Sequence, residues 1–193
     1  MVQKIALTGA PGSGKSSILR EMELTYEERI IPEAAEDIIR YLQTKGNPRP
    51  WELLDFQDRI LDLQIQREKQ IENIGGRVFM DRGILDGLAY YQLKGKTPSE
   101  SMLRAIEESN KRYKKVFLIE LGNDCQKTGI RREDLREAKE LERLQYENYT
   151  KAGYKVERVP YLGIEKRAKI ILDILFLSNL EEWKGGEENG RTK

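Results

Sequence analysis

The chain has 193 residues, with 34 Lys or Arg against 33 Asp or Glu, one cysteine and no histidine. The absence of histidine excludes Ser-His-Asp and Cys-His triads and every zinc site that needs imidazole, and the lone Cys125 excludes a disulfide within the chain. Any chemistry must therefore use carboxylates, amines, guanidinium groups, hydroxyls, backbone amides or an oxygen-bound metal. The charge balance produces no overall field that favours nucleic acid, so no nucleic-acid partner is expected.

We expect neither a secretion signal nor a membrane span. The residues after Met1 lack the layout of a signal peptide, and the longest apolar stretch, 170–177, contains Asp173 and is too short to cross a bilayer. We therefore expect a cytoplasmic protein with a single domain over residues 1–183. The charged, glycine-rich tail 184–193 is expected to fray.

Short apolar runs alternate with amphipathic segments along the chain. The runs predict strands at 4–8, 29–32, 77–81, 115–121 and 154–159. Apolar residues recur at helical spacing over 51–74, 133–152 and 164–180, which predicts helices. Strands that are joined by helical crossovers form a parallel sheet with helices on both faces. The predicted fold class is therefore α/β, a three-layer α/β/α arrangement whose middle layer is a five-stranded parallel sheet.

A glycine-rich segment follows the first predicted strand and opens a helix. Residues 9–16 read Gly-Ala-Pro-Gly-Ser-Gly-Lys-Ser, which fits the P-loop pattern G-x-x-x-x-G-K-[ST]. In this pattern backbone N–H groups surround a β-phosphate, the lysine reaches the β- and γ-phosphates, and the last hydroxyl ligates Mg²⁺. A chance lysine in a glycine-rich turn is the alternative. We expect an ATP site, with GTP also possible, formed by Gly9, Pro11, Gly12, Ser13, Gly14, Lys15, Ser16 and Ser17.

The third predicted strand ends in Asp81 and Arg82. Open α/β sheets bind their ligands at the carboxyl ends of the strands, so Asp81 could hold Mg²⁺ together with Ser16. Arg82 stands where hydrolytic P-loop proteins commonly carry a water-activating glutamate, and a guanidinium group there suits the binding of phosphate oxygens. The alternative is an ordinary ion pair. Asp86 and Tyr90, four residues apart, would share one face of the helix that follows.

Two further segments carry candidate catalytic groups. Glu33 follows the second strand and could orient a substrate hydroxyl or accept its proton; alternatively, it is an acid favoured at a helix N-terminus. Residues 122–134 contain Gly129 with Arg131 and Arg132, which suits a lid that closes over a transferring phosphoryl group. The alternative is a charged helix start. The candidate catalytic residues are Lys15, Glu33, Asp81, Arg82 and Arg131, with Arg132 assigned to nucleotide binding.

These motifs, in this order, resemble the AAA-domain predicted-ATPase family, which is related to the ribosylnicotinamide kinase domain of bacterial NAD regulators. The resemblance extends to about residue 177, and its most specific stretch is Asp-Arg-Gly-x-x-Asp-Gly-x-x-Tyr at 81–90. The Asp-Arg pair is also similar to thymidylate and deoxynucleoside kinases. The resemblance implies a P-loop NTPase fold with strand order 2-3-1-4-5, a nucleoside triphosphate with Mg²⁺, and lid arginines. Thr128 departs from the family, whose members often carry aspartate there.

The leading hypothesis is a Mg²⁺-dependent small-molecule kinase that transfers the ATP γ-phosphoryl group to a hydroxyl of a nucleoside-like acceptor. The alternatives are an ATP- or GTP-binding regulatory switch and a slow NTPase, of which the NTPase is disfavoured by Arg82. The loop 160–163 is a candidate contact for the nucleotide base. The sequence identifies neither the acceptor nor the oligomeric state.

Overall fold

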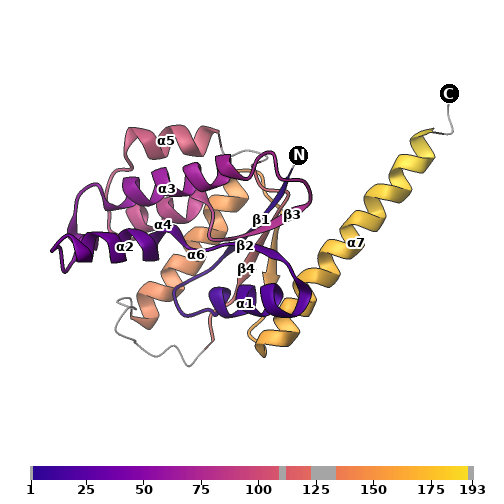
Figure 1. Ribbon diagram of the computed structural model, residues 1–193, viewed down its shortest axis with the longest axis horizontal. Coiled ribbons are helices and arrows are strands. Elements are labelled where there is room, and N and C mark those ends of the chain that lie inside the picture. Colours follow the sequence, from indigo (N-terminus) through magenta and orange to yellow (C-terminus); the bar gives the residue numbers. More distant parts are fainter. Residues whose placement is uncertain (1, 109–111, 123–133, 191–193) are drawn as a thin grey trace.

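A computed structural model describes residues 2–108, 112–122 and 134–190, with the side chains of the last helix described as far as Leu180 (Figure 1). The described residues contain a five-stranded sheet in the order β2-β3-β1-β4-β5, and every strand pair in it is parallel. The predicted fold class and strand order are therefore confirmed. The strands are β1 (Gln3–Thr8), β2 (Arg29–Ile31), β3 (Arg77–Asp81), β4 (Lys115–Ile119) and β5 (Val156–Val159).

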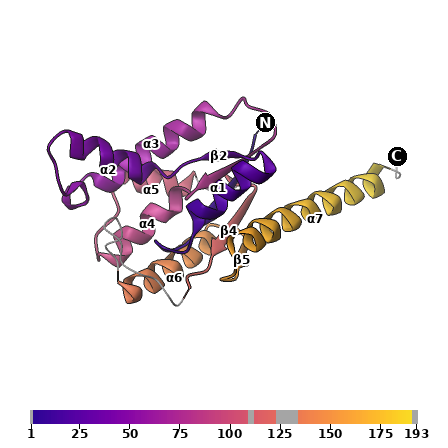
Figure 2. The same ribbon diagram turned by 60° about the horizontal axis from the view of Figure 1, so that its bottom comes forward.

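Helices cover both faces of this sheet, as the two views in Figures 1 and 2 show. One face is covered by α1 (Lys15–Tyr26) and α7 (Ile164–Gly190). The opposite face is covered by α3 (Phe56–Gln70), α4 (Ile84–Leu93) and α6 (Leu135–Lys151). Three shorter elements pack outside these helices, namely α2 (Ala34–Thr44), the 3₁₀ turn η1 (Pro50–Glu52) and α5 (Glu100–Glu107).

Alternate residues of the central strands contribute to two separate cores. Ile5 and Leu7 of β1 pack with residues of α1 and α7, whereas Ala6 between them packs with Leu85 of α4 and Tyr149 of α6. Side chains alternate across a strand, and a parallel sheet is buried on both faces. This explains why the strands appear in the sequence as nearly continuous apolar runs.

The observed boundaries differ from the predicted ones where proline or helix caps intervene. β2 ends at Ile31, because Pro32 has no N–H to extend the ladder. The helix predicted over 51–74 is shorter, since a 3₁₀ turn begins at Pro50 and α3 starts at Phe56. Helix α5 was not predicted, although Ser99 caps it by accepting a hydrogen bond from the Met102 N–H.

Helix α7 continues past its predicted end at residue 180 to Gly190 and extends away from the body of the molecule in both views. The expectation that residues 184–193 fray stays a prediction. Among the described residues, no helix combines the length and the apolar character that crossing a bilayer requires.

The strand order determines which segments meet at the site. Because all strands are parallel, their carboxyl ends lie at one edge of the sheet. β3 lies between β1 and β2 in the sheet. The segments that follow these three strands begin at Gly9, Pro32 and Arg82, and they are therefore neighbours in space despite their separation in the sequence.

Candidate active site

The glycine-rich loop begins directly after β1 and has the backbone that its sequence predicts. Gly9, Gly12 and Gly14 have φ values of 140°, 87° and 93°, a region that L side chains rarely adopt. At Gly9 there is also no space, because a Cβ would lie 2.5 Å from the carbonyl oxygen of Ile119. Gly14 is the N-cap of α1, so the helix and its exposed N–H groups begin where a phosphate would bind.

Lys15 is folded back onto this loop. Its side chain is buried, and Nζ donates hydrogen bonds to the carbonyl oxygens of Gly9 at 2.8 Å and Ala10 at 3.0 Å. Burial, with a further contribution from the charge of Arg82, lowers the pKa of Lys15 to about 8. The ammonium group is therefore held by neutral carbonyls in a site where it is electrostatically unfavourable, and a phosphate would offer it a full negative charge.

Asp81, at the end of β3, pairs with Ser16 of α1. The Ser16 hydroxyl donates to Oδ2 of Asp81 at 2.6 Å, while Oδ1 is buried without a hydrogen-bond partner in the described residues. Burial, with the neighbouring charge of Glu33, raises the pKa of Asp81 against the opposing effects of Lys15 and Ser16. Leaving a carboxylate oxygen buried and unpaired is costly unless a cation binds it.

The pair fits the requirements of Mg²⁺. This ion prefers oxygen ligands and is usually held by one or two protein groups together with substrate phosphates and water. Ser16 and Asp81 supply one hydroxyl and one carboxylate, and the described residues contain no group of three or more acidic, Cys or His side chains that could hold a metal without the nucleotide. The donor set is therefore the one expected for a metal that arrives with a nucleotide.

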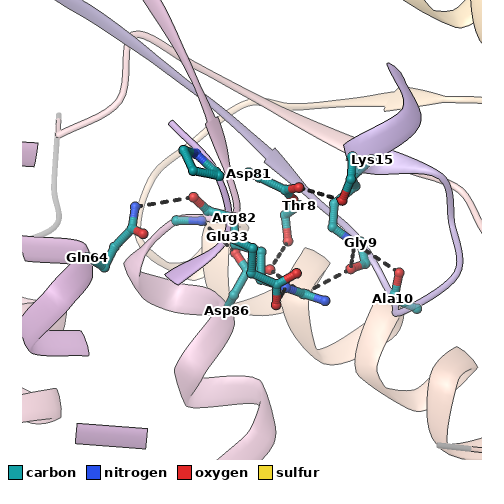
Figure 3. A network of polar contacts seen from close by, with 12 residues as sticks. Thr8, Gly9, Ala10, Lys15, Glu33, Gln64, Asp81, Arg82 and Asp86 are labelled. Carbon is teal, nitrogen blue, oxygen red and sulfur yellow. Dashed lines mark hydrogen bonds and ion pairs between the residues drawn. The ribbon is translucent and has the colours of Figure 1, made fainter. Parts of the chain in front are cut away.

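Arg82 follows Asp81 in an unusual backbone conformation. Its φ is 75°, in the left-handed region that costs a non-glycine residue roughly 1–3 kcal/mol and that often occurs at functional sites. The guanidinium group is buried and donates to Glu33 Oε1 at 2.7 Å, to the carbonyl of Gly9 at 3.2 Å and to Asp86 Oδ1 at 3.2 Å. Figure 3 shows these side chains converging beside the P-loop.

Glu33 occupies the N-cap position of α2, but its side chain makes no capping hydrogen bond. Oε1 instead accepts the hydrogen bond from Arg82. Burial acts to raise the pKa of Glu33, but the charges of Arg82 and Lys15 and the hydrogen bond outweigh it, so the pKa lies below its ordinary value. Oε2 accepts no hydrogen bond from a described residue, and this ionised carboxylate lines the cavity described below.

Asp86 holds the guanidinium group of Arg82 through a hydrogen-bonded ion pair. Within the described residues it accepts hydrogen bonds from five donors: Thr8 Oγ1 (2.8 Å), Arg82 Nη1 (3.2 Å), Gln145 Nε2 (3.0 Å), Gly83 N (3.0 Å) and Tyr149 OH (2.8 Å). The sequence pattern placed Asp86 near the site but gave it no role. Its bond to the N–H of Gly83, the N-cap residue of α4, satisfies a donor at the helix start, so the spacing Asp-Arg-Gly-x-x-Asp is also a helix-start signal.

A further buried carboxylate, Glu68 of α3, was not identified from the sequence. It accepts hydrogen bonds from Tyr113 OH at 2.8 Å and Gln64 Nε2 at 3.1 Å, and it pairs with Lys4 and Arg112. The Tyr113 hydroxyl also accepts from the N–H of Ile84, and Gln64 Nε2 reaches the carbonyl of Arg82 at 3.4 Å. Through Gln64 and Tyr113, Glu68 therefore stabilises the turn at Arg82. It lies on the buried face of α3 with Leu61 and Gln64, but in the sequence it is one more charge on an amphipathic helix.

A cavity of about 380 Å³ opens between the P-loop and helices α2, α3 and α4. This volume is in the range of small-molecule sites. Its lining includes four charged or hydroxyl-bearing residues from the P-loop edge of the sheet, namely Lys15, Ser16, Glu33 and Arg82. It also includes a group of mainly aromatic and apolar side chains with two amides and two lysines, namely Trp51, Phe56, Gln57, Ile60, Gln64, Tyr90, Tyr91, Lys94, Lys96 and Met102.

The structure brings together most of the predicted residues. Gly9, Lys15, Glu33, Asp81 and Arg82 lie together at the carboxyl edge of the sheet (Figure 3). Gly12, Ser13, Gly14 and Ser16 belong to the loop after β1 and the start of α1, and Pro11 and Ser17 line the cavity. The lid arginines Arg131 and Arg132 lie outside the described residues, so their roles stay predictions.

Comparison with solved structures shows a shared P-loop kinase fold. Deoxyadenosine kinase from M. mycoides matches with a TM-score of 0.65 at 18% identity, over 90% of this chain and 98% of that one. Thymidylate kinase from Candida albicans matches with a TM-score of 0.65 at 17% identity, over 92% of each chain. Shikimate kinase from Aquifex aeolicus matches with a TM-score of 0.55 at 16% identity, over 92% of this chain and 99% of that one.

Sequence comparisons give two results. The comparison with curated proteins returned no match. A family model described as AAA domain matches residues 4–167, which include the P-loop, Glu33 and the Asp81–Arg82 turn and agree with the family resemblance of the motifs. The chain therefore belongs to this AAA domain family, with a P-loop kinase-like fold.

Proposed function

We propose that the protein is a kinase that transfers the γ-phosphoryl group of ATP to a hydroxyl of a nucleoside-like small molecule. The observation that carries this proposal is one cavity whose lining includes both the P-loop and a group of aromatic side chains, together with Glu33 and Arg82. A hydrolase needs no aromatic pocket continuous with its phosphate site, whereas a transferase must hold an acceptor there. A cytoplasmic setting is part of the same proposal.

At the donor end, the loop from Gly9 to Ser17 would surround the phosphates. Lys15 would exchange the carbonyls of Gly9 and Ala10 for phosphate oxygens. Ser16 and Asp81 would hold Mg²⁺, which supplies neutralisation of the phosphate charge. Arg82, with Arg131 and Arg132 from the lid, would add cationic hydrogen-bond donors.

Beside the P-loop, Glu33 would accept a hydrogen bond from the acceptor hydroxyl through Oε2. A carboxylate with a lowered pKa is a weak base, so we assign it mainly to orienting the hydroxyl for in-line attack. The transition state of phosphoryl transfer is loose, so it depends more on positioning than on early removal of the proton. Arg82 holds Glu33 in this place.

The acceptor pocket has the chemistry of a nucleoside site. Gln57 and Gln64 are two helical turns apart on one face of α3, and both line the cavity. Gln64 Nε2 is engaged by Glu68 and the carbonyl of Arg82, which fixes the orientation of the amide. Side-chain amides read the polar edges of bases, and aromatic side chains such as Trp51 and Phe56 stack on their faces.

A nucleotide-dependent switch is the second candidate, and one observation favours it. Helix α7 contacts the P-loop through Arg167 and extends beyond the body of the protein to Gly190, so it connects the nucleotide site to a distant surface. A switch would bind ATP or GTP without transferring phosphate to a small molecule.

The two candidates are separated by incubating the protein with Mg·ATP or Mg·GTP and a panel of nucleosides and small alcohols, and following acceptor mass. The kinase proposal expects one class of acceptor to gain one phosphoryl group and to raise the rate of ADP formation. Triphosphate binding without any productive acceptor would favour the switch instead. A high rate of ADP formation that no acceptor changes would identify an NTPase.

Glu33→Gln tests the assigned role within the same assay. The amide keeps an acceptor for Arg82 but loses the charge, so we expect transfer to fall by about 100-fold or more, within the range for a positioned acid or base, while ATP affinity stays within about threefold. Asp37→Asn is the matched control, because Asp37 is an exposed acid of α2 outside the cavity that pairs with Arg67. A tenfold loss of ATP affinity in Glu33→Gln would instead make Glu33 a binding or folding residue.

A further inference from the structure

An arginine from the far end of the chain reaches the P-loop. Arg167 lies in the first turn of α7, and its Nη1 donates a hydrogen bond to the carbonyl oxygen of Ser13 at 2.6 Å. The guanidinium carbon lies 5.4 Å from the centre of the Tyr161 ring. Only 4% of Arg167 is exposed, so this is a buried cation in contact with the loop.

The charge of Arg167 has no counterion among the described residues. Arg82 pairs with Glu33 and Asp86, and Arg112 pairs with Glu68, but no described carboxylate lies within ion-pair distance of Arg167. Its Nε is also buried, and no described residue accepts a hydrogen bond from it. A buried charge without a partner costs several kcal/mol, which makes it unusual unless a ligand supplies the opposite charge.

The pKa shifts also distinguish Arg167, which has no carboxylate partner among the described residues, from Arg82, which has two. Burial lowers the pKa of Arg167, and the nearby Tyr161 only partly opposes it. Burial acts in the same direction on Arg82, but Glu33 and other acidic neighbours outweigh it and raise the pKa. The charged form of Arg167 is therefore disfavoured by burial, and a bound anion would stabilise it.

The position of the guanidinium group relative to the loop indicates that the anion is a phosphate group. A Cβ at Gly14 would lie 2.8 Å from Nη2 and 3.2 Å from Nη1 of Arg167, so the cation packs directly against the N-cap of α1. Gly14 immediately precedes Lys15, and the N–H groups that begin α1 carry partial positive charge. Arg167 thus adds a full charge to the helix end that binds phosphate in this fold.

We propose that Arg167 is a positioning residue of the nucleotide site, which holds the P-loop through the Ser13 carbonyl and whose unbalanced charge is compensated by the phosphates of a bound nucleoside triphosphate. The inference rests on nucleotide binding at the P-loop and not on transfer to an acceptor. Because the effect is electrostatic, it increases with the number of phosphates on the ligand.

The test compares Arg167→Met, which removes the charge but keeps a long apolar stem, with Arg167→Lys, which keeps the charge. Calorimetric titration gives the affinities for Mg·ATP, Mg·ADP and AMP, and thermal unfolding gives the melting temperature with and without Mg·ATP. In Arg167→Met we expect the ATP affinity to fall about tenfold or more and the AMP affinity by less than threefold. In Arg167→Lys we expect a loss of less than about threefold for ATP.

The melting temperatures separate this role from a merely structural one. Without nucleotide, Arg167→Met should melt at the same or a higher temperature than the unmodified protein, because an uncompensated buried charge has gone, and ATP should then raise the melting temperature less. Arg143→Met, which removes an exposed arginine of α6 that pairs with Glu140 and Glu147, is the control and should change none of these values.

Three results would overturn the inference. These are an unchanged ATP affinity in Arg167→Met, an equal loss in Arg167→Lys and Arg167→Met, and an equal loss for AMP and ATP. If the unmodified protein bound no triphosphate, both this inference and the proposed function would fail. If the protein bound ATP as described but phosphorylated no acceptor, only the proposed kinase function would fail.

Discussion

The affinity for Mg·ATP should fall as the pH rises above 8, because Lys15 then loses its proton. In the unliganded protein, burial and the charge of Arg82 lower the pKa of this lysine from 10.5 to about 8. A bound triphosphate favours the ammonium form and raises the pKa again. Binding therefore takes up a proton at alkaline pH, and by linkage the affinity decreases as protons become scarce.

The size of the effect follows from the charged fraction of Lys15. With a pKa of about 8, roughly 90% of the side chains carry the charge at pH 7 and roughly 10% at pH 9. If the triphosphate binds the charged form, the affinity drops about tenfold over this interval, or about 1.4 kcal/mol. The phosphates themselves contribute little, since the last proton of a phosphate group leaves at a pKa of about 6.

Calorimetric titration at pH 7 and pH 9, in buffers with different heats of ionisation, measures both the affinity and the protons taken up. We expect close to one proton per ATP at pH 9 and close to none at pH 7. Lys15→Arg is the matched variant, because its guanidinium group stays charged over the whole interval and should abolish the pH dependence even if binding is weaker. The reasoning is wrong if the wild-type affinity is flat from pH 7 to 9 or if Lys15→Arg shows the same tenfold fall.

Three further substitutions have expected outcomes. Lys15→Met should raise the free energy of unfolding of the unliganded protein by up to about 3 kcal/mol at pH 7, because the lowered pKa of Lys15 destabilises the folded state below pH 8 and this cost disappears as the pH rises from about 8 to 10.5. A loss of stability in urea unfolding would contradict this. Gly83→Ala should cost about 1–3 kcal/mol, because the new Cβ would lie 2.3 Å from the Tyr149 hydroxyl oxygen, and a double-mutant cycle with Tyr149→Phe should recover part of the loss if that clash is the cause. Asp86→Asn should cost about 3–5 kcal/mol, because the amide nitrogen would face groups that all donate hydrogen bonds to the carboxylate, and a stability change under 1 kcal/mol in chemical denaturation would refute that role.

The features that could be predicted are those that local sequence controls. The strands of a parallel sheet are buried on both faces, so β1, β3 and β4 appear as uninterrupted apolar runs, and their cores were located within two residues. The P-loop could be recognised because three positive φ values require glycine at fixed positions. Glu33 and Asp81 could be found because each follows a strand, and parallel strands bring their carboxyl ends together.

The supporting network could not be predicted, because its partners are distant in the chain. Thr8 and Asp86 are 78 residues apart, Asp86 and Tyr149 are 63 apart, and Ser13 and Arg167 are 154 apart. In the sequence Glu68 resembles any charge on an amphipathic helix, and only the folded chain shows that it is fully buried. Local periodicity reports which face of a helix is apolar, but not which polar group on that face finds a donor on another element.

The environments of the two carboxylates at the site divide their roles in a protein without histidine. Burial and the charge of Glu33 raise the pKa of Asp81, whereas Arg82 and Lys15 hold the pKa of Glu33 below its ordinary value against the effect of burial. When neighbouring acids are shifted in opposite directions, the lowered one is the permanent anion and the raised one is the group that gains most from an added cation. Glu33 is thus the group suited to a neutral hydroxyl, and Asp81, with its unpaired Oδ1, the one suited to a metal. Exchanging the two residues would place the metal ligand beside Arg82 and leave the acceptor hydroxyl facing a carboxyl group that is harder to ionise, so their order along the chain is itself part of the site.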